Sequence, residues 1–226
     1  MSLAQLAGLL AEPTRAAICL ALIDGRSWTA GELARYVGVA PSTASEQLTR
    51  LIEGGLLAEE RQGRHRYVRI AGPAVATLVE DLASFAEGGT APARPGGLRE
   101  ATRRGAEARA RTCYDHLAGQ LGVAVTEALL CRGLLSEEDG LTVTESGRGW
   151  LAEQRIDLPA RGSRPVVRNC LDWTERRNHL GGALGAALCR AAFDRSWVER
   201  IGTGRALRVT PAGQQAFHDL LGVRAG

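Results

Sequence analysis

The sequence is poor in several residue types. It contains no lysine, so all 28 basic residues are arginine, and aromatic residues make up only 4% of the chain. Few aromatics beside abundant Ala, Gly and Leu are typical of a mostly helical protein. The net charge of +3 is only mildly basic, so nucleic-acid binding has to be argued from local clusters of charge.

Long apolar runs are also missing. No stretch approaches the roughly 20 apolar residues of a membrane helix, and the N-terminus lacks the basic start of a secretory signal. These absences predict a cytoplasmic protein with no membrane partner. The five cysteines (Cys19, Cys113, Cys131, Cys170 and Cys189) are widely spaced and form no CxxC pair, so we expect thiols and no disulfide framework.

Recognisable catalytic motifs are absent as well. The second half contains no glycine-rich nucleotide loop after a strand, no GxSxG and no HExxH. These absences argue against an enzyme.

The segment from Thr29 to Ile70 carries the clearest signal. Thr29 and Glu32 form a capping box, which predicts the start of a helix. Gly38 supplies the left-handed backbone of a sharp turn, and Pro41 suits the first turn of a second helix. The sequence therefore predicts a helix-turn-helix here.

The second helix has two distinct faces. Ala44, Leu48, Leu51, Ile52 and Leu56 follow the spacing of a buried face. Side chains that can hydrogen-bond base edges and phosphates lie opposite: Ser42, Thr43, Glu46, Gln47 and Arg50. An ordinary amphipathic surface helix would show the same pattern, so the continuation of the chain decides between the two interpretations.

A basic hairpin follows this helix. Gly54 and Gly55 end the helix, a strand begins at Leu56, and the return strand is Tyr67–Ile70. The tip between them contains no acid and carries four basic or titratable side chains: Arg61, Arg64, His65 and Arg66. Such a tip suits a phosphate backbone while the neighbouring helix enters the major groove. The pattern favours a winged helix-turn-helix bound to double-stranded DNA. One alternative is an enzyme that uses a winged-helix domain for dimerisation, and the missing catalytic motifs argue against it. The other is a winged-helix adaptor that binds protein, and the acid-free tip and the hydroxyl, amide and arginine face of the helix argue against it.

Composition divides the chain into two domains. Residues 1–88 form the predicted DNA-binding and dimerisation domain, with further helices over 3–10, 16–23 and 73–86. Residues 89–100 are a Gly/Pro-rich linker, and residues 101–226 form a C-terminal sensory or dimer-supporting domain. There, Leu141–Leu151 and Leu207–Phe217 both indicate a strand, a Thr-x-x-Gly turn and a helix. We therefore expect a mainly helical α+β protein whose second half consists of winged-helix-like units.

The first 85 residues resemble the ArsR/SmtB-type winged-helix regulators. The resemblance rests on LAEPTRAAICLAL, on TAGELARYVGVAPSTASEQLTRLIEGGLL and on the wing ending RHRYVRI. It implies a homodimeric repressor that binds a dyad-symmetric operator and is released by an inducer. However, Ser27–Glu32 lacks the Cys-x-Cys metal site of many members, and residues 73–86 contain no His or Cys. The usual metal responses of the family therefore do not carry over.

Two segments of the second half carry candidate ligands. If Arg111–His116 and Cys170–His179 are helical, Cys113 and His116 share one face, as do Glu175 and His179. Such groups suit a four-coordinate metal site. A small-molecule pocket lined by Tyr114, Trp173, Arg176 and His179, and thiol oxidation at Cys113 or Cys170, are alternatives. In the structural alternative, Asp172 and Glu175 cap a helix. A metal ion and a small-molecule inducer are both open as cofactors.

Overall fold

The computed structural model describes all residues except 24, 63–64, 89–97, 159–163, 203 and 225–226. Contacts divide the chain into two compact units, Met1–Ala83 and Ser84–Gly226. Most of the predicted linker therefore lies outside the described residues, and a helix already begins at Leu98. Within the described part of the chain, none of the helices combines the length and apolar character needed to cross a bilayer.

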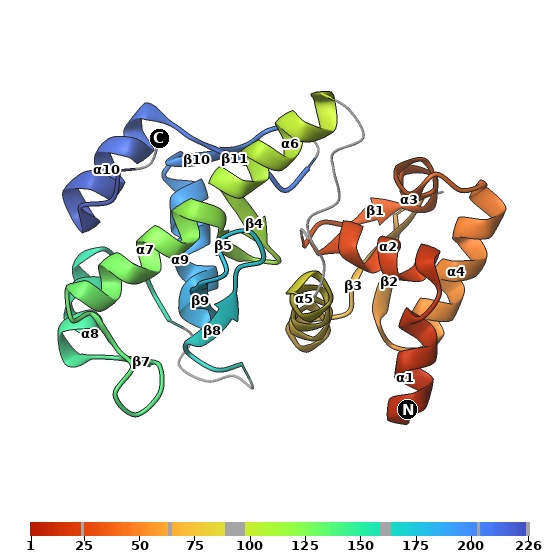
Figure 1. Ribbon diagram of the computed structural model, residues 1–226, viewed down its shortest axis with the longest axis horizontal. Helices are drawn as coiled ribbons and strands as arrows, with labels where there is room; N and C mark the ends of the chain where they lie inside the picture. The colour runs from red at the N-terminus through yellow and green to blue at the C-terminus, as the bar shows by residue number, and fades with distance from the viewer. Residues whose placement is uncertain (24, 63–64, 89–97, 159–163, 203, 225–226) are drawn as a thin grey trace. The chain divides into compact units, whose positions relative to one another are not determined.

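The first unit follows the order of a winged helix-turn-helix (Figure 1). Its elements are α1 (Leu3–Leu10), α2 (Pro13–Leu22), β1 (Trp28–Thr29), α3 (Ala30–Val37), α4 (Pro41–Glu53), β2 (Leu57–Gln62), β3 (His65–Ile70) and α5 (Pro73–Gly88), the last of which runs on past Ala83. The strands form one antiparallel sheet in the order β1-β3-β2. The winged helix-turn-helix prediction is confirmed, whereas β1 was not predicted.

Local signals set most of these boundaries. At the start of α3, the Glu32 amide donates to the Thr29 hydroxyl, and the Thr29 amide donates to the Glu32 carboxylate. Helix α2 was predicted to begin at Ala16 but begins at Pro13, because Glu12 caps it and Pro13 takes the first helical position. The pKa of Glu12 is lowered chiefly because the Thr14 amide donates to its carboxylate.

The core of the first unit joins α2, α3 and α4 to the sheet. Its fully buried members include Ile18, Leu22, Leu33, Leu48, Leu51 and Val68. Cys19 is part of this core, as expected, and burial raises the pKa of its thiol to about 12. The core thus fixes α4 by one face only.

The second unit contains two successions of hairpin, helix, hairpin and helix. After α6 (Leu98–Arg109), the first is β4 (Arg111–Cys113), β5 (His116–Ala118), α7 (Gly119–Cys131), β6 (Leu135–Ser136), β7 (Thr142–Val143) and α8 (Glu145–Glu153). The second is β8 (Arg168–Leu171), β9 (Asn178–Gly181), α9 (Gly182–Asp194), β10 (Val198–Arg200), β11 (Leu207–Val209) and α10 (Pro211–Leu221). All four hairpins are antiparallel.

The predicted Thr-x-x-Gly turns are helix N-caps. Thr144 accepts from the Gly147 amide at the start of α8, and Thr210 accepts from the Gly213 amide at the start of α10. Each threonine hydroxyl also donates to the chain before its hairpin, Thr144 to Gly133 and Thr210 to Ser196. The same cap therefore closes both successions, around a shared apolar core that includes Leu129, Leu184 and Phe217.

Candidate DNA-binding face and a buried cysteine–histidine cluster

Helix α4 presents one polar face. Gly38 ends α3 in the left-handed conformation with φ 73°, and Pro41 occupies the first helical position of α4. Three residues of α4 are buried: Ala44, Leu48 and Leu51. The turn and the buried face together leave the opposite side of α4 exposed.

The predicted DNA-contacting residues of α4 are not equally exposed to solvent. Ser42, Glu46 and Arg50 are exposed, and Arg50 forms an ion pair with Glu46 at 2.7 Å. Thr43 is half-buried. Ser45 is also exposed and was missed, although its position three residues after Ser42 places it on the same face.

Gln47 makes an internal contact. Its side-chain oxygen accepts from Arg15 Nη1 at 2.8 Å. Arg15 is itself only 8% exposed and also donates to the carbonyl oxygens of Gly8 and Leu9. Gln47 therefore connects α4 to α2 and, through Arg15, to α1. Its side-chain oxygen is directed at Arg15 and not outward to DNA.

The wing differs from its predicted form. The strands extend to Gln62 and His65, so Arg61 and Arg66 are cross-strand partners within the hairpin. Arg66 Nε lies 2.5 Å from Glu59 Oε2, so an acid from β2 neutralises one of the arginines. Arg64 lies outside the described residues, and the side chain of His65 is not described. Arg61 is exposed at the end of β2.

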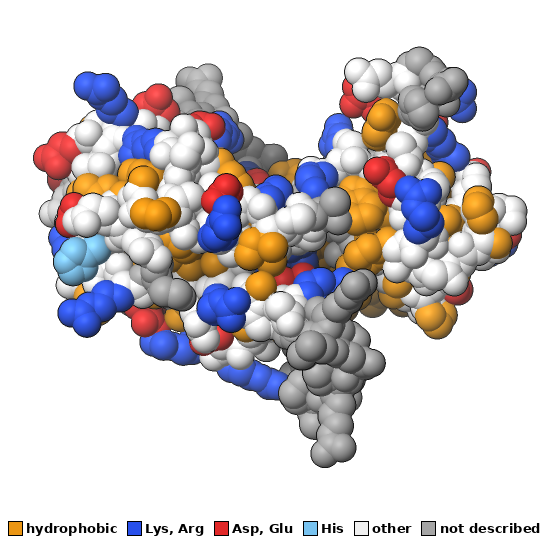
Figure 2. Space-filling view, turned by 90° about the horizontal axis from the view of Figure 1, so that it is seen from above, with side chains coloured by type: hydrophobic (Ala, Val, Ile, Leu, Met, Phe, Trp, Pro, Cys, Tyr) orange, Lys and Arg blue, Asp and Glu red, His pale blue; other side chains and the backbone are white. Residues whose placement is uncertain are grey.

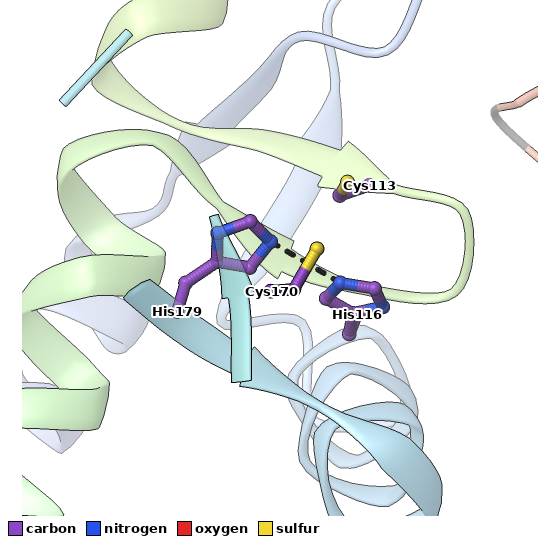
Figure 3. A group of neighbouring side chains, drawn as sticks. All are labelled: Cys113, His116, Cys170 and His179. Carbon is purple, nitrogen blue, oxygen red and sulfur yellow. Dashed lines mark hydrogen bonds between the residues drawn. The ribbon is translucent and has the colours of Figure 1, made fainter. Parts of the chain in front are cut away.

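In the second unit, four buried side chains converge (Figure 3). Cys113, His116, Cys170 and His179 are each less than 7% exposed. One ligand atom from each lies within 4.8 Å of the other three. We call these residues the Cys–His cluster. None of the five cysteines forms a disulfide.

The cluster is built from hairpins and not from the predicted helices. Cys113 on β4 is the cross-strand partner of His116 on β5, and Cys170 on β8 is that of His179 on β9. The turn at Tyr114, with φ 54°, allows the first hairpin to be this tight. A spacing of three residues brings side chains together in a helix and also across such a hairpin.

Each imidazole has a carboxylate behind it. The Nε2 atoms of His116 and His179 face one another at 3.2 Å. On the far side, His116 Nδ1 lies 3.4 Å from Asp115, and His179 Nδ1 lies 3.4 Å from Asp172. Among the described residues, His179 Nδ1 is one of the few buried side-chain nitrogen or oxygen atoms that make no hydrogen bond.

Each of these carboxylates is held by an arginine. Asp115 receives both terminal nitrogens of Arg164, at 2.5 and 2.9 Å. Asp172 Oδ1 lies 2.9 Å from Arg111 Nη2, and both side chains are fully buried. Burial alone would raise the pKa of both carboxyls, but these ion pairs and hydrogen bonds outweigh it and lower both pKa values to about 2. Both histidines therefore face ionised carboxylates at neutral pH.

The thiols and imidazoles also act on one another. The pKa of Cys170 is lowered chiefly by the hydrogen bond with Cys113, with further contributions from the two histidines, against the effect of burial. Burial lowers the pKa of His179. By contrast, burial raises the pKa of Cys189, which lies on α9 outside the cluster, to about 12. Thiolate and neutral imidazole are the forms that bind metal ions.

Other predicted ligands are not brought into the cluster. Asp172 and Glu175 do not cap a helix, because the chain forms a loop there; Asp172 Oδ1 instead accepts from the amides of Thr174 and Glu175. Arg176 is exposed while His179 is fully buried, so they do not line one pocket. Trp173 packs under the Arg111 guanidinium at 4.9 Å. Tyr114 is the positive-φ residue of the first hairpin turn.

The arrangement of the first unit defines a class: a winged helix-turn-helix protein with a polar face on its second helix. Comparison with known proteins agrees. Residues 10–60 match the model of a helix-turn-helix domain. The chain is 38% identical over 226 residues to the uncharacterised HTH-type transcriptional regulator YdfF of Bacillus subtilis, covering 99% of this chain and 98% of that protein. The chain therefore belongs to the family of helix-turn-helix transcriptional regulators.

Two solved structures are similar to part of the chain. One is the homodimeric winged helix-turn-helix DNA-binding domain of a protein from Mycobacterium bovis, 30% identical, with a TM-score of 0.37 over 40% of this chain and 83% of that one. The other is the transcriptional repressor BigR from Xylella fastidiosa, 29% identical, with a TM-score of 0.34 over 36% of this chain and 83% of that one.

Proposed function

We propose that this regulator is a homodimeric repressor that binds a dyad-symmetric operator in double-stranded DNA. Residues 1–88 serve as the DNA-binding and dimerisation domain, and residues 101–226 sense the inducer that releases the DNA. The proposal includes the cytoplasmic location expected from the sequence. The observation that carries it is the exposed polar face of α4 opposite a fully buried one.

This face has the chemistry of a base reader. Ser42 and Ser45 offer hydroxyl groups, and Glu46 and Arg50 offer a carboxylate and a guanidinium. Their mutual ion pair is exposed, so it costs little to exchange for contacts with bases or phosphates. Arg61 on the wing is placed beyond the internal pair of Arg66 with Glu59 and suits a phosphate contact.

The distribution of surface charge does not point to a second DNA-binding surface. On the face shown in Figure 2, basic and acidic side chains are interspersed and do not form one large patch of a single sign. With a net charge of only +3, nonspecific attraction to DNA is modest. Specific contacts of α4 therefore have to supply much of the selectivity.

Exposed apolar side chains on two helices support the dimer. Helix α1 has the sequence LAQLAGLL, and none of its residues is buried. Leu3 is 82% exposed, and Phe85 on α5 is 85% exposed. Apolar side chains this exposed on two helices are typical of an interface with a second copy.

Release of DNA requires a coupling between ligand and operator. A coupling free energy of ~1 to 3 kcal/mol would weaken operator binding ~5- to 150-fold. In our proposal, the ligand acts by changing the spacing or mobility of the two recognition helices of the dimer.

Two sets of variants test the assignment of α4 and the wing. Arg61→Ala removes a phosphate contact of the wing, so it should weaken binding to all DNA sequences alike and flatten the salt dependence. Ser42→Ala with Ser45→Ala removes base contacts, so it should relax the base preference in a selection from random DNA. Arg208→Ala, which removes an exposed arginine of β11, serves as the control. Unchanged binding in both sets would refute the proposed docking.

A further inference from the structure

We propose that the Cys–His cluster binds one metal ion of the Zn²⁺ type, with Cys113, His116, Cys170 and His179 as its four ligands. The site lies within the second unit and does not depend on the operator binding proposed above. Only its role as the inducer site rests on that proposed function.

The geometry fits a tetrahedral ion. Zn–N bonds of about 2.0–2.1 Å place two nitrogen ligands about 3.3 Å apart, and Zn–S bonds of about 2.3 Å place two sulfur ligands about 3.8 Å apart. The two Nε2 atoms are 3.2 Å apart, and all four ligand atoms lie within 4.8 Å of one another. Binding therefore needs at most small side-chain movements. Figure 3 shows the sulfur of Cys170 next to the dashed line that joins the two imidazole rings.

The groups around the two histidines are those expected around metal-binding histidines and not those of an apolar core. When Nε2 of a histidine binds a metal, Nδ1–H is free to donate, and a carboxylate is the usual acceptor. Both cluster histidines have such a carboxylate 3.4 Å from Nδ1, Asp115 for His116 and Asp172 for His179. The buried His179 Nδ1 makes no hydrogen bond in the structure. With Nε2 on a metal, the Nδ1 proton would point to Asp172.

The two Cys–His pairs come from corresponding parts of the two successions. Arg111-x-Cys113 on β4 matches Arg168-x-Cys170 on β8, and the run from His116 to Gly122 matches the run from His179 to Gly185. In both, the last glycine of the run lets the following helix touch the histidine strand, because an added Cβ would lie 2.4 Å from Leu117 O at Gly122 and 2.2 Å from Leu180 O at Gly185. Each succession thus contributes one thiol and one imidazole to the Cys–His cluster.

The two successions also pack against each other. Helix α7 contacts β9, and α9 contacts β5. The Gly119 amide, at the start of α7, donates to Asp172 Oδ2 at 2.7 Å, and the Leu180 amide on β9 donates to Thr126 at 2.8 Å. A metal ion held by both Cys–His pairs would join the two successions at the point where they meet.

The ligand set identifies the class of ion and of site. Two thiolates and two imidazoles favour a borderline ion such as Zn²⁺ over Mg²⁺ or Ca²⁺, which take oxygen ligands. Four protein ligands leave no open position for water or substrate. The site is therefore structural or regulatory, and not catalytic.

Metal binding is tested on the full-length chain, purified under reducing conditions. The chain is stripped with a chelator, reloaded with Zn²⁺ or Co²⁺ and assayed for bound metal by elemental analysis. We expect one ion per chain. We also expect the visible absorption of tetrahedral Co²⁺ together with a thiolate charge-transfer band in the near ultraviolet. Absence of stoichiometric binding by the wild-type chain would overturn the proposal.

Matched variants assign the ligands. Cys170→Ser and His179→Ala should weaken binding by more than about 100-fold. Cys189→Ser removes a buried thiol of α9 outside the cluster, and His218→Gln an exposed imidazole; both should bind as the wild type does. Cys113→His retains a ligand, so it should keep the ion but weaken the charge-transfer band, which separates ligand loss from misfolding. Equal metal content in all variants would refute the site. A Cys113–Cys170 disulfide in protein purified under reducing conditions would also refute it.

The regulatory role is measured separately. Operator affinity is determined with the stripped chain and with the Zn²⁺-loaded chain. If Zn²⁺ binds but operator affinity is unchanged, the metal site stands as a structural one and its role as the inducer site fails. If the chain binds no specific DNA in either form, the proposed function fails while the metal site is unaffected.

Discussion

At the scale of single residues, Arg111 and Asp172 form a fully buried ion pair in the second unit. Both side chains are fully buried, and Asp172 also receives the Gly119 amide and faces His179. A buried charge that loses its partner is strongly destabilising, whereas exposed pairs contribute little. The pair therefore supports both the fold and the orientation of His179.

Replacing Arg111 tests this role. Arg111→Met leaves the Asp172 carboxylate buried without a countercharge, so it should lower the free energy of unfolding by about 3–5 kcal/mol. Arg208→Met removes an exposed pair with Glu199 and should change it by less than about 1 kcal/mol. Urea unfolding of the full chain measures both. Similar losses in the two variants would contradict the account.

The pKa of Asp172 predicts a dependence of stability on pH. Its folded value of about 2 lies below the ordinary value of about 3.9. The ionised carboxylate therefore stabilises the fold above pH ~4, and this contribution is lost as the pH falls towards 2. We expect the stability difference between the wild type and Asp172→Asn to shrink over that interval. A difference that stays constant from pH 5 to pH 2 would rule this out.

At the scale of elements, Gly122 on α7 and Gly185 on α9 are two of the glycines that let helices and strands approach closely. Gly185 on α9 is the clearer case, because an added Cβ would lie 2.2 Å from Leu180 O and 3.1 Å from His116 Cβ. Neither the backbone nor the histidine strand can move without disturbing β9 or the Cys–His cluster.

Gly185→Ala should therefore cost at least about 1–3 kcal/mol of unfolding free energy through overpacking. Gly149→Ala is the matched control, since Gly149 lies within α8 with no atom within 4 Å of an added Cβ. That change should stabilise the chain by up to about 1 kcal/mol through helix propensity. Thermal unfolding of both variants gives the comparison, and a neutral Gly185→Ala would show that the close approach is not required.

Elements whose signals are local could be predicted from the sequence. The capping box of Thr29 and Glu32, the turn at Gly38 and the start of α4 at Pro41 need only neighbouring residues. The spacing of Cys113 and His116 fits a helix and a tight hairpin equally well, so the sequence alone does not decide between the two. Nothing in the sequence around Gln47 reveals that Arg15, 32 positions earlier, occupies its side-chain oxygen.

At the scale of the whole molecule, the sequence revealed half of the internal repetition. The Thr144 and Thr210 caps were recognised as a recurring pattern, although as turns. The match between the Cys–His hairpins was missed, because Tyr114–Asp115 joins one hairpin and the longer Asp172–Arg177 joins the other. The number of residues between the cysteine and its histidine partner therefore differs between the two hairpins. The cross-strand pairing shows that they correspond.

The proposed dimer belongs to this scale too. Wild-type protein should have twice the chain mass in light scattering after size-exclusion chromatography. Leu3→Glu with Phe85→Glu places charges on two of the most exposed apolar side chains, so it should give a monomer with weaker operator binding. Ile201→Glu, at an exposed apolar residue outside the helices, should remain dimeric. A monomeric wild type would remove the basis for a dyad-symmetric operator.

The central claim is that α4 gives this chain sequence-specific binding to DNA. The most direct measurement compares the affinity of the full-length chain for the DNA upstream of its own gene with that for a shuffled sequence of the same composition, over a range of salt concentrations. We predict binding at least about 10³-fold tighter to the upstream DNA at physiological salt. Equal affinity for the two sequences would contradict the account.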